Sequence, residues 1–170
     1  MKKLVFVLTT VVALGFSQMA TAQKTIVDAA VGNENFSTLV AALKAGDLVA
    51  ALQGDGPFTV FAPTNEAFAK IDKATLSDLL KPENKETLAK ILTYHVISGK
   101  LMASDVVAAL KEGKGKVEVK TLAGQILTVI KKDGKIWLKD QAGNYSEITA
   151  TDVEGSNGVI HVIDSVVMPK

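Results

Sequence analysis

The sequence predicts an α+β domain in which helices come first along the chain and a mostly antiparallel β-sheet follows. Apolar residues recur at helical spacing over residues 25–110, and from Val117 onward they alternate with polar residues at the period of two typical of strands. Asp133-Gly134 lies between two such alternating runs and is a strong signal for a two-residue hairpin turn. The last run, Gly158 to Pro169, is almost wholly apolar, which is typical of a buried strand.

The helical half carries recognisable start signals. Ser37 and Asp47 are suitable N-caps, Thr64 or Asn65 caps a helix behind a strand, and Pro82 opens the longest helix. We expect helices over residues 25–31, 38–45, 48–53, around Phe68–Ile71 and Leu76–Leu80, over 83–97, and over 106–110 behind Ser104 and Asp105.

The strands follow from alternation and from the turns that bound them. Pro63 ends a first strand that begins at Phe58, and Asn157-Gly158 is a turn that launches the last one. We expect strands over residues 58–62, 117–120, 125–130, 135–139, 146–153 and 158–169.

The first 22 residues have the pattern of a secretory signal. Met1-Lys2-Lys3 is basic, residues 4–16 are almost wholly apolar, and Ala20-Thr21-Ala22 offers the small residues that a signal peptidase reads. The sequence therefore predicts a signal peptide over residues 1–22 and one mature domain over residues 23–170, either secreted or periplasmic. An uncleaved N-terminal anchor is the alternative.

Charge and cysteine content narrow the function classes. Without Lys2 and Lys3 the chain has 17 basic residues against 18 acidic ones, a net charge of −1, and every basic residue is Lys. A protein that binds nucleic acid would be expected to carry Arg and a basic excess, so we expect no such partner. There is no Cys, so the domain must depend on its core and not on disulfides.

His161 and Asp164 are the polar residues inside the last apolar run. Side chains three apart on one strand point to opposite faces, so this pair is not placed to act as a catalytic dyad. We expect each to be a structural polar group with a fixed hydrogen-bond partner, because an unpaired buried group costs about 1–3 kcal/mol.

Tyr94 and His95 end a predicted helix. His95 falls on its apolar face and is expected in the core, whereas Tyr94 lies at the edge of that face, where a tyrosine can anchor a partner protein. Adjacent helical residues project about 100° apart, which disfavours a haem ligand pair.

Other signals of chemistry are weak. With His95 and His161 as the only histidines and no Cys, we expect no metal site, and no nucleophile elbow or P-loop occurs. We therefore expect no catalytic residue and no cofactor. Trp137 is either exposed on the outer face of its hairpin, where it can mark a binding surface, or covered by a helix or loop.

Two segments of the chain resemble the sequence boxes of the fasciclin (FAS1) domain family. The first is Phe58 to Phe68, the second is Asn157 to Asp164, and Tyr94-His95 and Gly99-Lys100-Leu101 stand between them in the expected order. The resemblance covers nearly all of the mature chain. It implies a wedge of two small β-sheets with a helical layer, in a bacterial secreted single-domain member.

The resemblance also implies a function without catalysis: cell adhesion, or binding of a cell-surface or matrix protein. Tyr94 and His95, together with Asp152 and Val153, occupy the places of the family's partner-binding segments, although Glu154 replaces the apolar residue expected next. Four polar residues, His161, Asp164, Thr64 and Asn65, are expected to be structural. A secreted domain that binds a small ligand or carbohydrate through Trp137 is the alternative.

Overall fold

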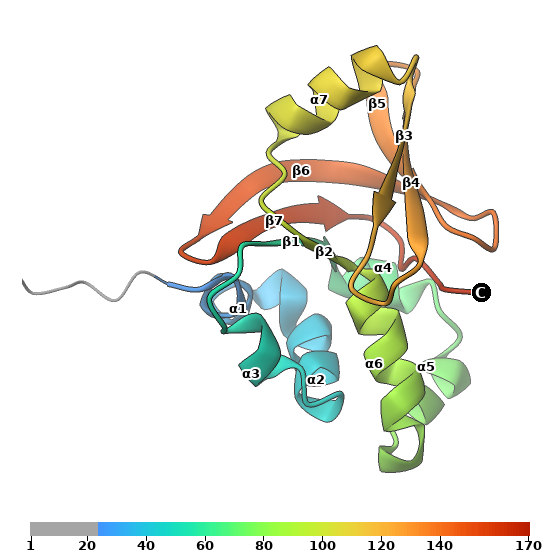
Figure 1. Cartoon of the computed structure of the whole chain (residues 1–170). Helices are drawn as coiled ribbons and strands as arrows, with labels where there is room; N and C mark the ends of the chain where they lie inside the picture. The colour runs from blue at the N-terminus through green and yellow to red at the C-terminus, as the bar shows by residue number, and fades with distance from the viewer. Residues whose placement is uncertain (1–23) are drawn as a thin grey trace, which may run out of the picture.

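The computed structural model describes residues 24–170, so the predicted signal peptide lies outside the described residues. Within that range no helix is both long and apolar enough to cross a bilayer. The chain folds as a layer of short helices against a twisted sheet, with one further helix at the opposite end (Figure 1).

The helices are short, and α1, α4 and α5 begin behind a polar side chain that caps them; of the predicted caps, Thr64 is confirmed. Thr25 accepts the backbone N–H of Asp28 at 3.2 Å, and Thr64 accepts that of Ala67 at 3.3 Å. The helices are α1 (Ile26–Val31), α2 (Ser37–Ala45), α3 (Val49–Leu52), α4 (Asn65–Ala69), α5 (Lys73–Leu79), α6 (Lys85–Tyr94) and α7 (Ala103–Glu112), with 3-10 turns η1 (Glu34–Phe36) and η2 (Pro82–Asn84).

The strands form one seven-stranded order, β2-β1-β7-β6-β5-β4-β3, which confirms the α+β prediction. All pairs are antiparallel except β1 with β7. The strands are β1 (Phe58–Pro63), β2 (Val96–Ser98), β3 (Lys116–Lys120), β4 (Ile126–Lys132), β5 (Lys135–Lys139), β6 (Tyr145–Gly155) and β7 (Gly158–Ile163).

The long strand β6 joins two groups of strands. Its first residues pair with β5 and its later ones with β7, with register shifts between Ile148 and Val153 that bend the strand. Strands β3, β4 and β5 consequently stand apart from β1, β2 and β7 in Figure 1, as two halves of a wedge.

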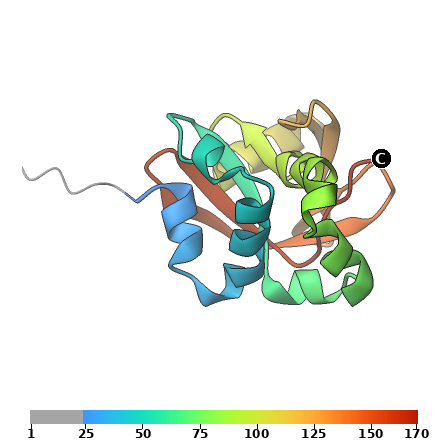
Figure 2. The ribbon, with the colours of Figure 1, turned by 90° about the horizontal axis from the view of Figure 1, so that it is seen from below.

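Two hydrophobic cores lie on opposite sides of β7. Ile160 belongs to the core under helices α1 to α6, which cover one face of β1 and β7 in Figure 2. Ile163 belongs to the second core, between α7 and the inner face of β3 to β5, together with Leu127 and Leu138. A buried strand with apolar side chains on both faces explains why its sequence is nearly continuous in apolar residues.

Gly158 opens β7 beside Phe58 of β1, where there is no room for a side chain. A Cβ atom at this position would overlap the carbonyl oxygen of Phe58. Any larger residue would push the two strands apart, which is why the turn before β7 ends in glycine.

Several boundary predictions were wrong. Helix α7 begins at Ala103, so Ser104 and Asp105 lie inside it and do not precede it. Helix α6 ends at Tyr94 and not at Ile97, because Val96–Ser98 pairs with β1 as strand β2, and pairing with a central strand overrides helical spacing. Asp47 caps no helix; its φ is 57° and its carboxylate meets Lys85. Strand β7 ends at Ile163, so Asp164 lies just beyond it.

Candidate interaction surface

His161 is held from two sides inside the wedge, with 1% of its surface exposed. Its Nε2 lies 2.7 Å from the carbonyl oxygen of Leu101, and its Nδ1 lies 3.4 Å from the backbone nitrogen of Asp152. A carbonyl only accepts and a backbone N–H only donates, so a neutral ring with its proton on Nε2 satisfies both. The ring also lies 5.8 Å, centroid to centroid, from Phe61. This is an architectural arrangement with no free nitrogen for chemistry.

His95 is the second buried histidine, and its position in the core agrees with the sequence prediction. Nδ1 lies 2.8 Å from the Ile91 carbonyl oxygen, and Nε2 accepts the backbone N–H of Val167 at 3.2 Å. Burial disfavours the charged ring and lowers the pKa of His95 to about 4, although the Ile91 carbonyl acts in the opposite direction. The neutral ring thus ties α6 to the C-terminal segment.

Tyr94 is wholly buried, so the expectation that it lies at the rim of its helix is wrong. Its hydroxyl donates to the carbonyl oxygen of Ile126 at 3.0 Å, and burial raises the pKa of the phenol. The reason is that the second core, which includes residues of β3 and β4, covers the C-terminal end of α6. Helical spacing alone does not show that these strands pack there.

The carboxylate of Asp164 contacts the first residues of β6 and the residue that follows α4. Its Oδ1 accepts the backbone N–H of Glu147 at 2.9 Å, and its Oδ2 lies 3.2 Å from Nζ of Lys70. Partial burial pushes the pKa of the Asp164 carboxyl upward, but the hydrogen bonds from Glu147, Lys70 and Ser165 outweigh it and hold the pKa below its ordinary value.

The side chain of Asn65 links two helices. It accepts the backbone N–H of Thr38 at 3.0 Å and donates to the carbonyl oxygen of Glu34 at 2.8 Å. It therefore caps the first turn of α2. Ser37, the predicted N-cap, is instead the first residue of the helix.

Asn157 is a structural residue that sequence reasoning treated only as part of a turn. Its buried side chain accepts the backbone N–H of Ile26 at 3.0 Å and donates to the carbonyl oxygens of Leu52 and Gly54 at 2.7 and 2.8 Å. An asparagine beside a glycine already explains the turn, so nothing in the sequence pointed to these distant partners.

Asp152 and Val153 lie on the bent part of β6. Asp152 has a φ of 59°, and its carboxylate accepts the backbone N–H of Ala103 at 2.8 Å, at the start of α7. Val153 is 38% exposed. Tyr94 and His95 are interior and this pair is at the surface, so the structure does not present the four predicted partner-binding residues together on one exposed patch.

The outer face of β3 to β6 carries two exposed apolar or aromatic side chains, those of Ile126 and Tyr145. The strand registers align its residues in rows across the sheet. We call the residues of these rows the lysine–aromatic face. The two full rows are Lys116, Ile130, Trp137 and Glu147, then Glu118, Thr128, Lys139 and Tyr145. Two shorter rows belong to the same face: Lys132 with Lys135, and Lys120 with Ile126.

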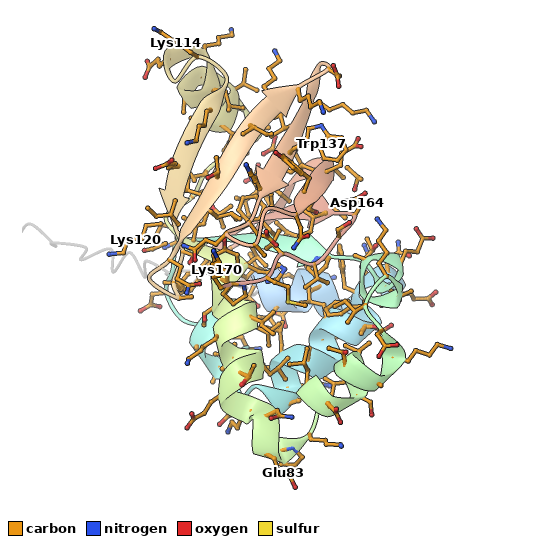
Figure 3. The ribbon with its side chains drawn as sticks, turned by 90° about the vertical axis from the view of Figure 1, so that its right-hand side faces the viewer. Glu83, Lys114, Lys120, Trp137, Asp164 and Lys170 are labelled. Atoms are coloured by element: carbon orange, nitrogen blue, oxygen red, sulfur yellow. The ribbon has the colours of Figure 1, made fainter. Side chains whose placement is uncertain are left out.

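Figure 3 shows this side of the molecule, with Trp137 and Lys120 labelled. Tyr145 is 48% and Ile126 46% exposed, and both line a hollow of about 370 Å³ on this face. Lys139 stands over the Tyr145 ring with Nζ 5.5 Å from the ring centroid. Aromatic and apolar side chains exposed together around a hollow are typical of a binding surface and not of a solvated face.

Trp137 lies on this outer face, half-buried beside a second hollow of about 210 Å³ that it shares with Lys132, Asp133 and Tyr145. Its indole nitrogen has no hydrogen-bond partner among the described residues. Trp137 is therefore on the outer face of the hairpin, as one of the two predictions had it, but its side chain is partly covered.

Residues 24–170 contain no group of three or more His, Cys, Asp or Glu side chains that could hold a metal ion. Both histidines use both ring nitrogens, and Asp164 is neutralised by an ion pair. The side chains of both histidines and Asp164 are therefore bonded within the domain.

Residues 34–169 match the family model of the fasciclin domain. The chain belongs to the fasciclin family. It is 53% identical over 154 residues to Protein sll1483 of Synechocystis, covering 90% of this chain and 78% of that protein. It is 37% identical over 153 residues to the cell surface glycolipoprotein MPB83 of Mycobacterium bovis, covering 87% of this chain and 62% of that protein.

The fold agrees with a solved fasciclin structure. A FAS1 domain pair from the insect cell adhesion molecule Fasciclin I superposes with a TM-score of 0.74 at 20% identity, covering 84% of this chain and 50% of that one. The two segments that carried the sequence resemblance are neighbours in the fold. β1 and β7 pair in parallel with Phe61 opposite His161, so the fasciclin boxes mark a shared pair of buried strands.

Proposed function

We propose that this fasciclin domain is a non-catalytic extracytoplasmic module that binds a component of the cell surface or matrix and acts in adhesion. Membership of the family and the similarity to a protein named as a cell surface glycolipoprotein support this role. The observation that carries it is the lysine–aromatic face, where Tyr145 and Ile126 stay exposed around a hollow, while the polar residues of the interior are bonded within the domain.

Two further parts of the proposal concern regions outside this face. The signal over residues 1–22 is cleaved after Ala22 and exports residues 23–170, which mass spectrometry of the exported protein would show. Asp152 and Val153 form an accessible second contact at the bend of β6. Tyr94 and His95 contribute by positioning the neighbouring strands, because neither reaches the surface.

The test is binding of the purified, labelled protein to isolated envelopes of the cells that produce it. We expect saturable binding that unlabelled protein displaces, and a smaller loss for Val153→Ala than for Tyr145→Ala. The proposal fails if retention by the envelopes is non-saturable, or equals that of an unrelated protein of similar size and charge.

A further inference from the structure

We propose that the ligand of the lysine–aromatic face is an acidic polysaccharide, a polymer of sugar rings that carry carboxylates. This inference rests on the proposed function and names its partner by chemistry. It starts from the uneven distribution of charge over a chain whose predicted mature form has a net charge of −1.

The face carries five lysines and two glutamates, and two aspartates, Asp133 and Asp140, also line its hollows, so its local charge is +1. Both glutamates are neutralised, Glu118 by Lys116 and Glu147 by Lys135, each at 2.7 Å. The other three lysines, at positions 120, 132 and 139, form no ion pair among residues 24–170. Since these three lysines outnumber the two aspartates of the hollows, the face keeps a positive excess on a nearly neutral domain and is complementary to a negatively charged partner.

The aromatic residues of the face indicate what kind of anion it binds. Tyr145 lines both hollows of the face, and Trp137 lines the smaller one. A sugar ring presents apolar C–H groups to an aromatic ring and hydroxyls to its surroundings, and the larger hollow offers Thr128 and Gln141 as hydrogen-bonding neighbours. Carboxylates along the same polymer would meet the unpaired lysines.

Two other anionic partners fit less well. A membrane surface requires protruding apolar side chains, whereas Trp137 is half-buried and the apolar residues line concave surfaces. Nucleic acid is disfavoured by the absence of Arg from the chain, because Arg is the residue that pairs with phosphate in bidentate geometry.

The experiment measures the affinity of the purified protein for alginate by calorimetry, beside dextran as a neutral polysaccharide and polyglutamate as an anionic polymer without sugar rings. We expect alginate to bind at least about 10-fold more tightly than either, because only alginate combines ring and charge. Its affinity should fall as salt rises, since exposed charges are screened.

Variants test whether alginate binds to the lysine–aromatic face. Replacing Lys120, Lys132 and Lys139 together by Gln should weaken alginate binding by about 100-fold, since each lysine near an anionic surface raises affinity about 5-fold. Tyr145→Ala should weaken it about 10-fold.

The matched control replaces Lys44, Lys73 and Lys90 by Gln, which removes the same charge from exposed, unpaired lysines of the helical layer. This control should bind alginate as the unchanged protein does. Equal weakening of both triple variants, or polyglutamate or anionic vesicles bound as tightly as alginate, would overturn the inference.

Envelope binding separates the two proposals. If envelopes still bind the protein after periodate oxidation of their sugars but not after protease treatment, the partner is a protein; the adhesion role then stands and the acidic polysaccharide does not. If untreated envelopes show no saturable binding, the proposed function itself fails.

Discussion

The two faces of the sheet formed by β4, β5 and the first residues of β6 are made by alternating sequences but meet opposite surroundings. Inward, Leu127 and Leu138 are fully buried under α7 beside the hydroxyl of Tyr94. Outward, Ile126 and Tyr145 remain about half exposed among lysines. The difference teaches that the conspicuous polar and aromatic residues of the interior serve the fold, and that residues without any sequence motif form the surface available to a partner.

The largest effect expected is on the inner side, at Tyr94. Tyr94→Ala should lower the free energy of unfolding by about 3–5 kcal/mol, because it opens a cavity in the second core. Tyr94→Phe removes only the hydrogen bond to Ile126 and should cost about 1 kcal/mol. Urea denaturation measures both, and a Tyr94→Ala variant that unfolds like the unchanged protein would place Tyr94 at the surface again.

His161→Ala should cost about 2–4 kcal/mol, since it leaves a cavity beside Phe61 and removes the partner of the Leu101 carbonyl. Val31→Ala is the matched truncation of a residue that is 58% exposed on α1, and should change stability by less than about 0.5 kcal/mol. Equal urea midpoints for the two variants would contradict a structural role for His161.

Acid should weaken the domain through His95. Its pKa is about 4 in the folded state and about 6.5 when unfolded, so the unfolded chain binds the extra proton first as pH falls. The contribution of neutral His95 to the free energy of unfolding is therefore fully present above about pH 6.5. It falls by up to about 3 kcal/mol as the pH is lowered toward 4. Asp164, whose folded pKa is lowered, acts only at lower pH, as its own carboxyl becomes protonated. A His95→Gln variant with the same loss between pH 6.5 and 4 would exclude His95 as the cause.

The smallest stability effect concerns the bend of β6. Asp152→Ala should cost about 1 kcal/mol, because alanine tolerates the φ of 59° poorly and cannot accept the backbone N–H of Ala103. Asp152→Asn keeps both properties and should be nearly neutral. Thermal denaturation compares them, and a neutral Asp152→Ala would show that the bend does not depend on this residue.

The sequence predicted those features that depend on local pattern. Alternation predicted that His161 and Asp164 point apart, and the two side chains do have different partners, although Asp164 lies just beyond the end of β7, where strand parity no longer applies. The Asp133-Gly134 hairpin is likewise a local feature, predicted from this pair of residues alone. The structure confirms it, because both central residues have positive φ, at 54° and 79°.

Features that depend on distant partners were missed. Helical spacing continued through Ile97, and only pairing with β1 shows that this residue is in a strand. Burial of Tyr94 required knowing that β3 and β4 close over it. Trp137 pointed to the outer face of its hairpin, but the lysines and Tyr145 join it in rows only once the strand registers are set, so the sequence did not indicate the rest of the lysine–aromatic face.

The most direct measurement is the affinity of the Tyr145→Ala variant for isolated envelopes, with Val31→Ala as the control and urea midpoints measured for both. If binding belongs to the lysine–aromatic face, Tyr145→Ala binds about 10-fold more weakly while its urea midpoint and the binding of Val31→Ala stay close to those of the unchanged protein. Unchanged binding by Tyr145→Ala, or equal weakening by Val31→Ala, would contradict the account.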